Sequence, residues 1–216
     1  MNPIRRSSGE ACSAAEKKTE CIIDAARSVF LQAGYGGATV DAIAAAAGVS
    51  KATIYTRFSS KQELFAAVIR QECKACSKRM ALAEEMPGPD LAATLQHMAE
   101  ALLDIILLPQ NLAITRVVIA EMPRFPELGQ VFYESGPAVT LDNLVGFLQR
   151  HMNNGALRIE DVELAAQQFI SLLRGDIQWR ALMGQVDVSE VARRRVASRT
   201  VQAFLRLYAT TPPVRR

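Results

Sequence analysis

Apolar residues recur at intervals of three and four along nearly the whole chain, and no segment shows the strict alternation that predicts a half-buried strand. Glycines and prolines interrupt this pattern at separated points and divide it into helices of different lengths. We therefore expect an all-α fold of about nine helices. Half of the 216 residues are hydrophobic, which suffices for one large domain or for a small domain followed by a medium one.

The expected helices cover residues 16–34, 40–47, 50–58, 61–85, 91–108, 112–122, 127–152, 160–183 and 188–208. Residues 1–15 mix small and polar side chains without a period, so we expect a disordered tail there. Thr39 and Ser50 are suitable N-caps, and Ser59 or Ser60 caps the helix at 61–85. Glu63 follows Ser60 by three residues, which predicts a capping box. Gly136-Pro137 predicts a kink within 127–152, and Pro109 is expected to close the helix before it.

The positive charge of the chain is concentrated near its N-terminus. Residues 1–61 contain eight lysines and arginines against five acidic residues, whereas residues 62–216 contain seventeen of each. The formal net charge of +3 therefore resides in the first 61 residues. A basic segment ahead of a neutral body suits a module that binds a polyanion, and a merely solvated basic tail is the alternative.

Two short helical segments in this basic region, 40–47 and 50–58, are separated by a turn that contains Gly48. Glycine supplies the backbone angles that such a turn needs. The apolar side chain of Val49 is expected to fill the angle between the two helices. Two short helices joined in this way are typical of a helix-turn-helix, whose second helix enters the major groove of DNA.

The second of these helices has an inner and an outer side. Ile54 and Phe58 lie four residues apart and are expected to face inward. The side chains left on the outer side can donate to phosphates or contact bases, and they belong to Lys51, Ala52, Thr53, Tyr55, Thr56 and Arg57. Thr39 and Ser50 begin helices, where backbone N–H groups favour a phosphate, and Lys61 adds a positive charge at the start of the next helix.

The residues around this turn also follow a known pattern. They are Ile22-Ile23-Asp24-Ala25-Ala26, Phe30, Gly34-Tyr35, Thr39-Val40-Asp41-Ala42-Ile43-Ala44, Ala47-Gly48-Val49-Ser50-Lys51-Ala52-Thr53-Ile54-Tyr55, Phe58 and Ser60-Lys61-Gln62-Glu63-Leu64-Phe65. This pattern resembles the DNA-binding region of TetR-family transcriptional regulators of the AcrR-like kind. The resemblance implies a three-helix DNA-binding domain at residues 16–61 and a helical ligand-binding and dimerisation domain at residues 62–216.

The resemblance implies roles for single residues of the turn region. Phosphate contacts are implied for Thr39, Ser50, Tyr55 and Lys61, and positions near the bases for Ala52, Thr53, Thr56 and Arg57. Many family members carry an aromatic residue followed by histidine where this chain has Thr56 and Arg57, so the resemblance does not predict which operator sequence this chain binds. Two alternatives remain, namely Tyr55 as a core side chain and Lys61 as an ordinary solvated lysine.

The last two expected helices are apolar on more than one side, as Phe169 and Leu172 illustrate. A helix that is apolar on two sides must bury both, one against its own chain and the other against a partner. The resemblance implies a homodimer through a four-helix bundle of these helices, and burial within a single chain is the alternative. A two-fold dimer predicts a near-palindromic DNA operator.

The resemblance further implies a repressor that is released from DNA when a small apolar effector binds in a cavity among the helices of residues 61–183. The candidate lining residues are Phe65, Leu95, Met98, Leu102, Val118, Met122, Phe132, Phe169 and Leu173. Core packing is the alternative for each of them, because periodicity does not separate a cavity wall from a core. Asp176 interrupts an apolar run, and we expect it to form a structural ion pair with Arg174, Arg180 or a partner chain.

Several enzyme classes leave no signature in this sequence. It has no glycine-rich phosphate loop and no nucleophile elbow, and its two histidines are far apart. We expect no catalytic residues, no cofactor and no metal. Cys73 and Cys76 lie on adjacent turns of one helix, where packing is expected and thiol sensing or metal binding are the alternatives. A DNA-binding architectural or thiol-sensing protein without a small-molecule ligand is the alternative function.

The sequence also bears on localisation. No apolar stretch approaches the roughly 20 residues that cross a bilayer. Residues 1–20 lack the apolar centre of a secretory signal, and the four cysteines do not have the spacing of a disulfide framework. We therefore expect a cytoplasmic protein.

Overall fold

The computed structural model describes residues 14–85, 90–185 and 189–210. These residues form ten α-helices and, apart from an isolated antiparallel bridge between Leu157 and Ala209, no β-structure. The expected all-α fold is confirmed. The chain divides into two compact units, Met1–Val68 and Ile69–Arg216.

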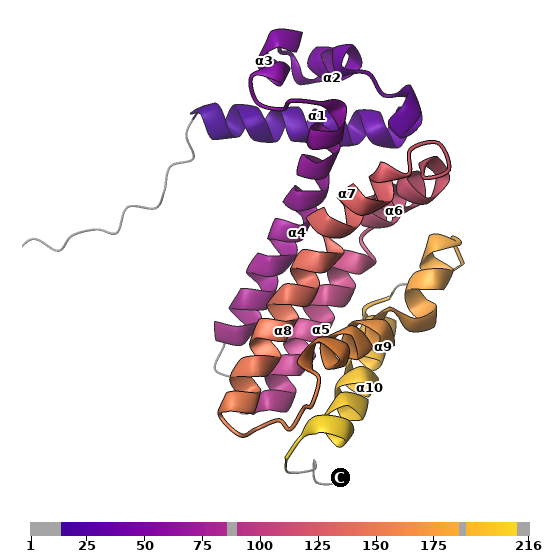
Figure 1. The fold of residues 1–216 in the computed structure, drawn as a ribbon. Coiled ribbons are helices and arrows are strands. Elements are labelled where there is room, and N and C mark those ends of the chain that lie inside the picture. The colour runs from indigo at the N-terminus through magenta and orange to yellow at the C-terminus, as the bar shows by residue number, and fades with distance from the viewer. Residues whose placement is uncertain (1–13, 86–89, 186–188, 211–216) are drawn as a thin grey trace, which may run out of the picture. The chain divides into compact units, whose positions relative to one another are not determined.

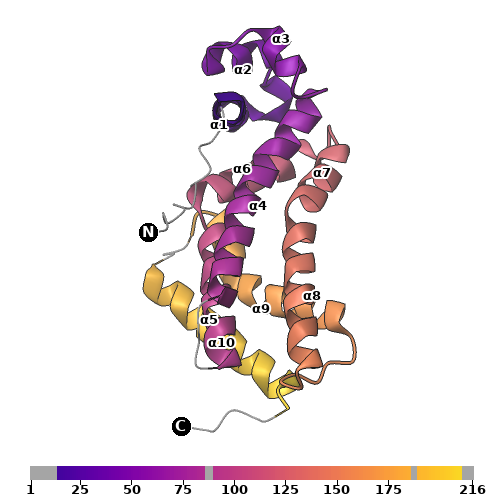
Figure 2. The ribbon, with the colours of Figure 1, turned by 90° about the vertical axis from the view of Figure 1, so that its left-hand side faces the viewer.

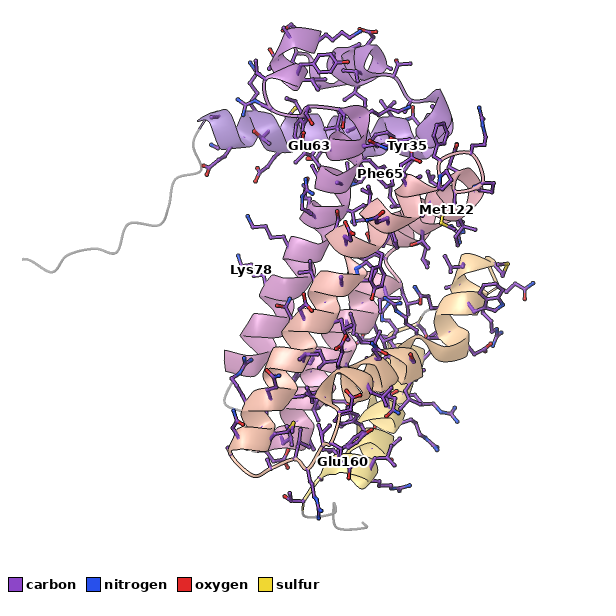
Figure 3. The ribbon with its side chains drawn as sticks, viewed as in Figure 1. Tyr35, Glu63, Phe65, Lys78, Met122 and Glu160 are labelled. Carbon is purple, nitrogen blue, oxygen red and sulfur yellow. The ribbon has the colours of Figure 1, made fainter. Side chains whose placement is uncertain are left out.

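The N-terminal unit contains α1 (Ala14–Gly37), α2 (Val40–Ala47), α3 (Lys51–Tyr55) and the first residues of α4 (Lys61–Glu85), as Figure 1 shows in indigo and purple. At its centre Phe30, Tyr35 and Phe65 pack as an aromatic cluster, with ring centroids 5.2–5.8 Å apart. Figure 3 labels Tyr35 and Phe65 of this cluster. Phe30 and Phe65 are completely buried. This cluster joins α1, which carries Phe30 and Tyr35, to the start of α4, which carries Phe65.

The short helices begin at the residues that the sequence predicted. The Thr39 hydroxyl accepts a hydrogen bond from the Ala42 backbone N–H at 3.1 Å. The Ser50 hydroxyl accepts one from the Thr53 N–H at 3.2 Å. Both residues therefore satisfy a backbone donor that would otherwise lack a partner at a helix start. Between the two helices Gly48 adopts left-handed backbone angles, with φ 64° and ψ 34°.

The start of α4 differs in one detail from a capping box. The Ser60 hydroxyl accepts a hydrogen bond from the Glu63 N–H at 3.1 Å, as expected for the N-cap. The Glu63 carboxylate, however, accepts hydrogen bonds from the N–H and hydroxyl of Ser59 rather than from the N–H of Ser60. Both serines therefore take part in the start of this helix.

The third helix is shorter than the expected range 50–58. It ends at Tyr55, and the N–H groups of Arg57 and Phe58 both donate to the Ile54 carbonyl at 2.9 Å, which closes the chain into a turn. Phe58 still reaches the core and is 6% exposed. The expected tail of residues 1–15 lies outside the described residues except for its last two, which belong to α1.

The C-terminal unit is made of α4 from Ile69 onward and six further helices. They are α5 (Leu91–Ile106), α6 (Pro109–Glu121), α7 (Glu127–Ser135), α8 (Pro137–Asn153), α9 (Val162–Leu182) and α10 (Glu190–Tyr208). In this unit α10 packs on α5 and α8 packs on α9. Figures 1 and 2 together show α10 on the side of α5 away from α4. Arg193 of α10 pairs with Asp104 of α5 at 3.0 Å, and Arg116 of α6 donates to the last carbonyls of α9 at 2.8 Å.

Two expected helix boundaries in this unit were wrong, whereas the irregularity expected at Gly136-Pro137 lies where it was predicted. The expected helix 127–152 is two helices, because Gly136 leaves helical geometry at φ −135° and ψ −83° and Pro137 starts α8. This break accounts for ten helices among the described residues where about nine were expected. Pro109 is the first residue of α6 rather than the end of α5, which stops at Ile106. Gly175 also interrupts α9, at φ 29° and ψ −139°, and this interruption was not predicted from the sequence.

Within the described ranges no single helix is both long and apolar enough to span a bilayer. The helices α5 and α6 meet that length and composition only when taken together, and they are bent by 59°.

We predict that Gly48→Ala and Gly146→Ala have opposite effects on stability. At Gly48 no atom crowds the added methyl group, so its cost is the left-handed backbone, about 1–2 kcal/mol. Gly146 lies inside α8, where the methyl group would contact Arg150 at an ordinary 3.5 Å, so alanine should stabilise by about 0.5–1 kcal/mol. Urea unfolding followed by circular dichroism measures both. If the Gly48→Ala variant were as stable as the parent protein, the prediction that the left-handed backbone at this position penalises a side chain would be wrong.

Candidate functional sites

The corner between α2 and α3 presents one side of α3 to solvent. Ile54 is 1% exposed and faces the core, whereas the side chain of Tyr55 next to it is 50% exposed. Lys51, Ala52 and Thr56 are also exposed, and Thr53 is half-buried. The outward residues expected from the sequence therefore form an accessible surface on this helix and its C-cap, and the inward residues are buried as expected.

Short-range bonds fix the polar groups of this surface. The hydroxyls of Ser50 and Thr53 lie 2.9 Å apart in a mutual hydrogen bond. The Thr56 hydroxyl donates to the Thr53 carbonyl at 2.9 Å. Lys51 donates to the Asp41 carboxylate at 2.9 Å, and this hydrogen bond together with the negative charge raises the pKa of Lys51. The lysine is exposed and stays charged at neutral pH, so it keeps positive charge at the start of α3.

Two other residues expected at the DNA have partners inside the unit. Arg57 donates from Nη1 to the Thr19 hydroxyl of α1 at 2.7 Å. Lys61 donates from Nζ to the carbonyls of Tyr35 and Ala38 at 2.8 and 3.1 Å, and the same nitrogen lies 4.5 Å from the centre of the Tyr35 ring. Both cations therefore brace α1 and the chain that follows it. The sequence could not reveal this, because the partners lie 23–38 residues away.

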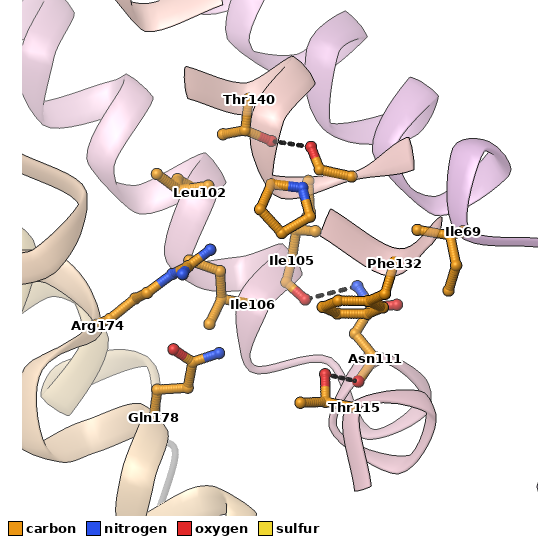
Figure 4. Close-up of a pocket in the computed structure, with 12 residues that line it drawn as sticks. Ile69, Leu102, Ile105, Ile106, Asn111, Thr115, Phe132, Thr140, Arg174 and Gln178 are labelled. Atoms are coloured by element: carbon orange, nitrogen blue, oxygen red, sulfur yellow. Dashed lines mark hydrogen bonds between the residues drawn. The ribbon is translucent and has the colours of Figure 1, made fainter. Parts of the chain in front are cut away.

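The C-terminal unit contains a cavity of about 200 Å³. Its walls come from α4, α5, α6, α8 and α9, with one residue from α7 and the glycine that follows it (Figure 4). The lining residues are Ile69, Leu102, Ile105, Ile106, Asn111, Thr115, Phe132, Gly136, Pro137, Thr140, Arg174 and Gln178. The break between α7 and α8 lies in the wall itself, since Gly136 and Pro137 line it. The cavity is therefore mostly apolar and has a few polar groups.

Of the nine candidate lining residues, Leu102 and Phe132 line this cavity. Phe65 belongs instead to the aromatic core of the N-terminal unit. The main core of the C-terminal unit contains Leu95, Met98, Phe169 and Leu173. Val118 is buried away from the cavity lining, and Met122 is 39% exposed. Core packing, the alternative weighed for each residue, describes most of them, because both roles require an apolar side chain on the inner side of a helix.

The polar lining residues were missed by the sequence reasoning. Asn111 donates from its amide to the Ile105 carbonyl at 2.7 Å, and the Thr115 hydroxyl donates to the Asn111 carbonyl at 2.7 Å. Arg174 and Gln178 reach into the cavity from α9 (Figure 4). They lie four residues apart in an apolar stretch of the sequence, and that spacing is the signal that would have found them.

The helices α9 and α10 and the C-cap of α9 carry large apolar side chains that this chain leaves exposed. They are Leu164, Leu172, Trp179, Met183, Val191 and Leu207, with exposed fractions from 45% to 77%. Asp176, on the same stretch of α9, pairs with Arg180 at 3.5 Å. The expected structural ion pair of Asp176 is therefore confirmed, with Arg180 as its partner.

The side chains of Cys73 and Cys76 lie outside the described residues. Cys21 is exposed, and its thiol lies 3.9 Å from the Ala47 carbonyl. The part of the chain that the structure describes contains no group of three or more histidine, cysteine, aspartate or glutamate side chains placed to hold a metal ion.

Comparisons with known proteins agree with this geometry. The family model for bacterial regulatory proteins of the TetR family matches residues 22–68, and the model for the C-terminal domain of AefR-like transcriptional repressors matches residues 93–210. The uncharacterised helix-turn-helix regulator YvkB of Bacillus subtilis is 29% identical over 168 residues, which is 78% of this chain and 85% of YvkB.

Solved structures are similar over most of the chain. A TetR-family transcriptional regulator of Mesorhizobium loti superposes with a TM-score of 0.78 and 29% identity, over 92% of this chain and 100% of that one. The flavonoid-responsive regulator FrrA superposes with a TM-score of 0.74 and 34% identity, over 90% of this chain and 98% of FrrA. These matches show that the chain belongs to the TetR family of helix-turn-helix DNA-binding transcriptional regulators, in agreement with the exposed surface of α3 and the cavity of the C-terminal unit.

Proposed function

We propose that this regulator is a repressor that binds a near-palindromic operator as a homodimer and leaves it when a small, largely apolar effector occupies the cavity of the C-terminal unit. The observation that carries the proposal is the exposed face of α3, which follows a left-handed corner at Gly48. The match to the C-terminal domain of AefR-like transcriptional repressors supports the sign of regulation.

Contacts to DNA are proposed for the exposed residues of the corner. Thr39, Ser50 and Tyr55 carry hydroxyl groups that can bind phosphate oxygens, and Lys51 adds a positive charge beside them. Ala52, Thr53 and Thr56 have small side chains that let α3 approach the base edges, with methyl groups suited to thymine. Arg57 and Lys61 act in this proposal through the fold, since they hold the unit together beneath the DNA-facing side.

The homodimer is proposed from the exposed apolar side chains of α9 and α10. Trp179 is 61% exposed and Val191 is 77% exposed, and exposed large apolar side chains on neighbouring helices are typical of an interaction surface. A second copy of the same two helices would cover them as a four-helix bundle. Two recognition helices related by a two-fold axis then require two half-sites of opposite orientation on the DNA.

The effector site is proposed to be the cavity around Leu102 and Phe132. FrrA, one of the similar structures, is described as flavonoid-responsive, which supports a small organic effector for this chain as well. The helix α4 begins at Lys61 in the DNA-binding unit and contributes Ile69 to the cavity wall, so an occupant would lie against a helix that continues into that unit. An effector can change operator affinity only through its different affinity for two conformations, a coupling of about 1–3 kcal/mol.

Footprinting on the DNA upstream of the protein's own gene tests this function directly. We expect one protected near-palindrome that disappears when an effector is added. Salt-sensitive binding without any preferred sequence would instead favour an architectural DNA-binding protein.

Tyr55→Ala is expected to weaken operator binding by about tenfold or more, because it removes a hydroxyl donor to a charged phosphate from each half-site. Fluorescence anisotropy with a labelled operator measures the change. Tyr133→Ala is the matched control, since Tyr133 is similarly exposed, 53% against 50%, but lies on α7. Equal operator affinity of the Tyr55→Ala variant and the parent would show that α3 is not the recognition helix.

Leu172→Glu is expected to raise the dimer dissociation constant by about tenfold or more, because a carboxylate would be buried in the proposed interface. The control is Ile119→Glu, which places the same charge on α6 at a residue of similar exposure, 50% against 45%. Sedimentation velocity over a range of protein concentrations distinguishes the two variants. A parent protein that sediments as a monomer, or a Leu172→Glu variant that dimerises normally, would refute this interface.

A further inference from the structure

Arg174 places a permanent positive charge at an apolar cavity. It lies on α9 directly before Gly175, where that helix is interrupted, and its side chain reaches toward Leu102 and Ile106 (Figure 4). A guanidinium is not deprotonated in proteins, so the charge persists even in surroundings of low polarity. A charge in such a place needs a counter-ion or hydrogen-bond acceptors.

The cavity supplies no such counter-ion. Among the described residues that line it there is no aspartate or glutamate. The Nε atom of Arg174 is buried without a hydrogen-bond partner. The nearby carboxylate of Asp176 pairs with Arg180 at 3.5 Å on the exposed side of α9. Burial lowers the pKa of Arg174, and the neighbouring Tyr133 acts in the opposite direction. An acceptor brought by a ligand would relieve the cost of the unpaired N–H group.

The polar side chains that line the cavity from α6 and α8 already donate to backbone carbonyls, so the donors available to a ligand lie on α9. The side chains of Asn111 and Thr115 donate to backbone carbonyls, and the Thr140 hydroxyl donates to the Gly136 carbonyl at 3.3 Å. Gln178 follows Arg174 by four residues and points into the same space (Figure 4). The cavity therefore has donors on the α9 side and mostly apolar surface elsewhere.

The size of the cavity limits the body of its ligand. An apolar cavity of about 150 Å³ lined by leucine, isoleucine and phenylalanine accepts one benzene ring. The cavity here measures about 200 Å³. A single ring with a short substituent, or a short acyl chain, matches this space.

We propose that the effector is a monocarboxylic acid with a one-ring or short acyl body, and that Arg174 selects it by pairing with the carboxylate. The inference rests on the proposed function, because it assigns the chemistry of the effector to the same cavity. The guanidinium can bind both carboxylate oxygens, while the body of the ligand packs on Leu102, Ile106 and Phe132. A neutral ligand of the same shape would leave the cation uncompensated, which disfavours it.

Pairs of ligands that differ only in charge test this proposal on the full-length protein. Calorimetric titration with cinnamate and cinnamamide, and with octanoate and octanamide, compares each acid with its neutral amide. We expect each acid to bind about tenfold or more tightly than its amide, the effect of a hydrogen bond to a charged group. This comparison needs no variant, so it does not depend on how a mutant folds.

Variants then assign the preference to Arg174. Arg174→Met should abolish the preference for the acid and leave the amide affinity unchanged, whereas Arg174→Lys should keep part of it. Arg158→Met removes an exposed cation outside the cavity and should change neither affinity. Circular dichroism and sedimentation of each variant verify the fold and the oligomeric state.

Three results would overturn the proposal. They are equal binding of acid and amide by the parent protein, an acid preference that survives in Arg174→Met, and no binding of either acid at about 1 mM, the weak end of specific affinity. Operator binding measured on the same samples keeps the two proposals distinguishable. If neutral compounds but no carboxylic acid released the protein from the operator, the repressor function would be supported and the proposal of a carboxylic-acid effector would be refuted. Absence of operator binding with an intact acid preference would refute the repressor and keep the anion site.

Discussion

The tight corner at Gly48 is the constraint on which the DNA-binding unit depends. Its left-handed backbone lets the chain leave α2 and begin α3 within three residues, a path on which a side chain at this position would be strained. Because α3 has only five residues, its stability comes from packing and from the Ser50 cap rather than from its own hydrogen bonds. Burial of Ile54 and Phe58 then fixes which side of α3 faces outward, and Tyr55 is presented to solvent as a consequence.

Breaks in the helices have a comparable role in the C-terminal unit. Gly136 and Pro137 separate α7 from α8, and the same two residues line the cavity. An uninterrupted helix would follow one straight axis there, whereas two helices can diverge around a space. Gly175 interrupts α9 directly after Arg174, next to the one cationic side chain that lines this cavity within the described residues. The irregular positions of this unit therefore coincide with its candidate ligand site, where departures from regular structure are most often retained.

Much of the fold could be predicted from local signals. Thr39, Gly48 and Ser50 act through hydrogen bonds and backbone angles that involve residues at most four positions away, so a sequence pattern captures them. The long helix α4 has the expected bounds for the same reason. The candidate cavity was predicted less well, since Leu95 and Leu102 lie on the same helix and both belong to the buried core, although only Leu102 also lines the cavity. Which of two buried apolar residues has a void beside it depends on the neighbouring helices, and no local pattern encodes that.

Helix periodicity, caps and the glycine corner are local properties, so they predict from the amino-acid order an all-α chain with a positively charged helix-turn-helix region near its N-terminus. The partners of the charged residues, in contrast, are set only in the folded chain. Arg57 and Lys61, which the sequence predicted at the DNA, hydrogen-bond to Thr19 and to the carbonyls of Tyr35 and Ala38. Arg174, one of the partners considered for Asp176, faces a cavity. The physical reason is that a charge is stabilised by whatever acceptor lies within a few ångströms, and residues far apart in sequence supply or withhold that acceptor only when the chain has folded.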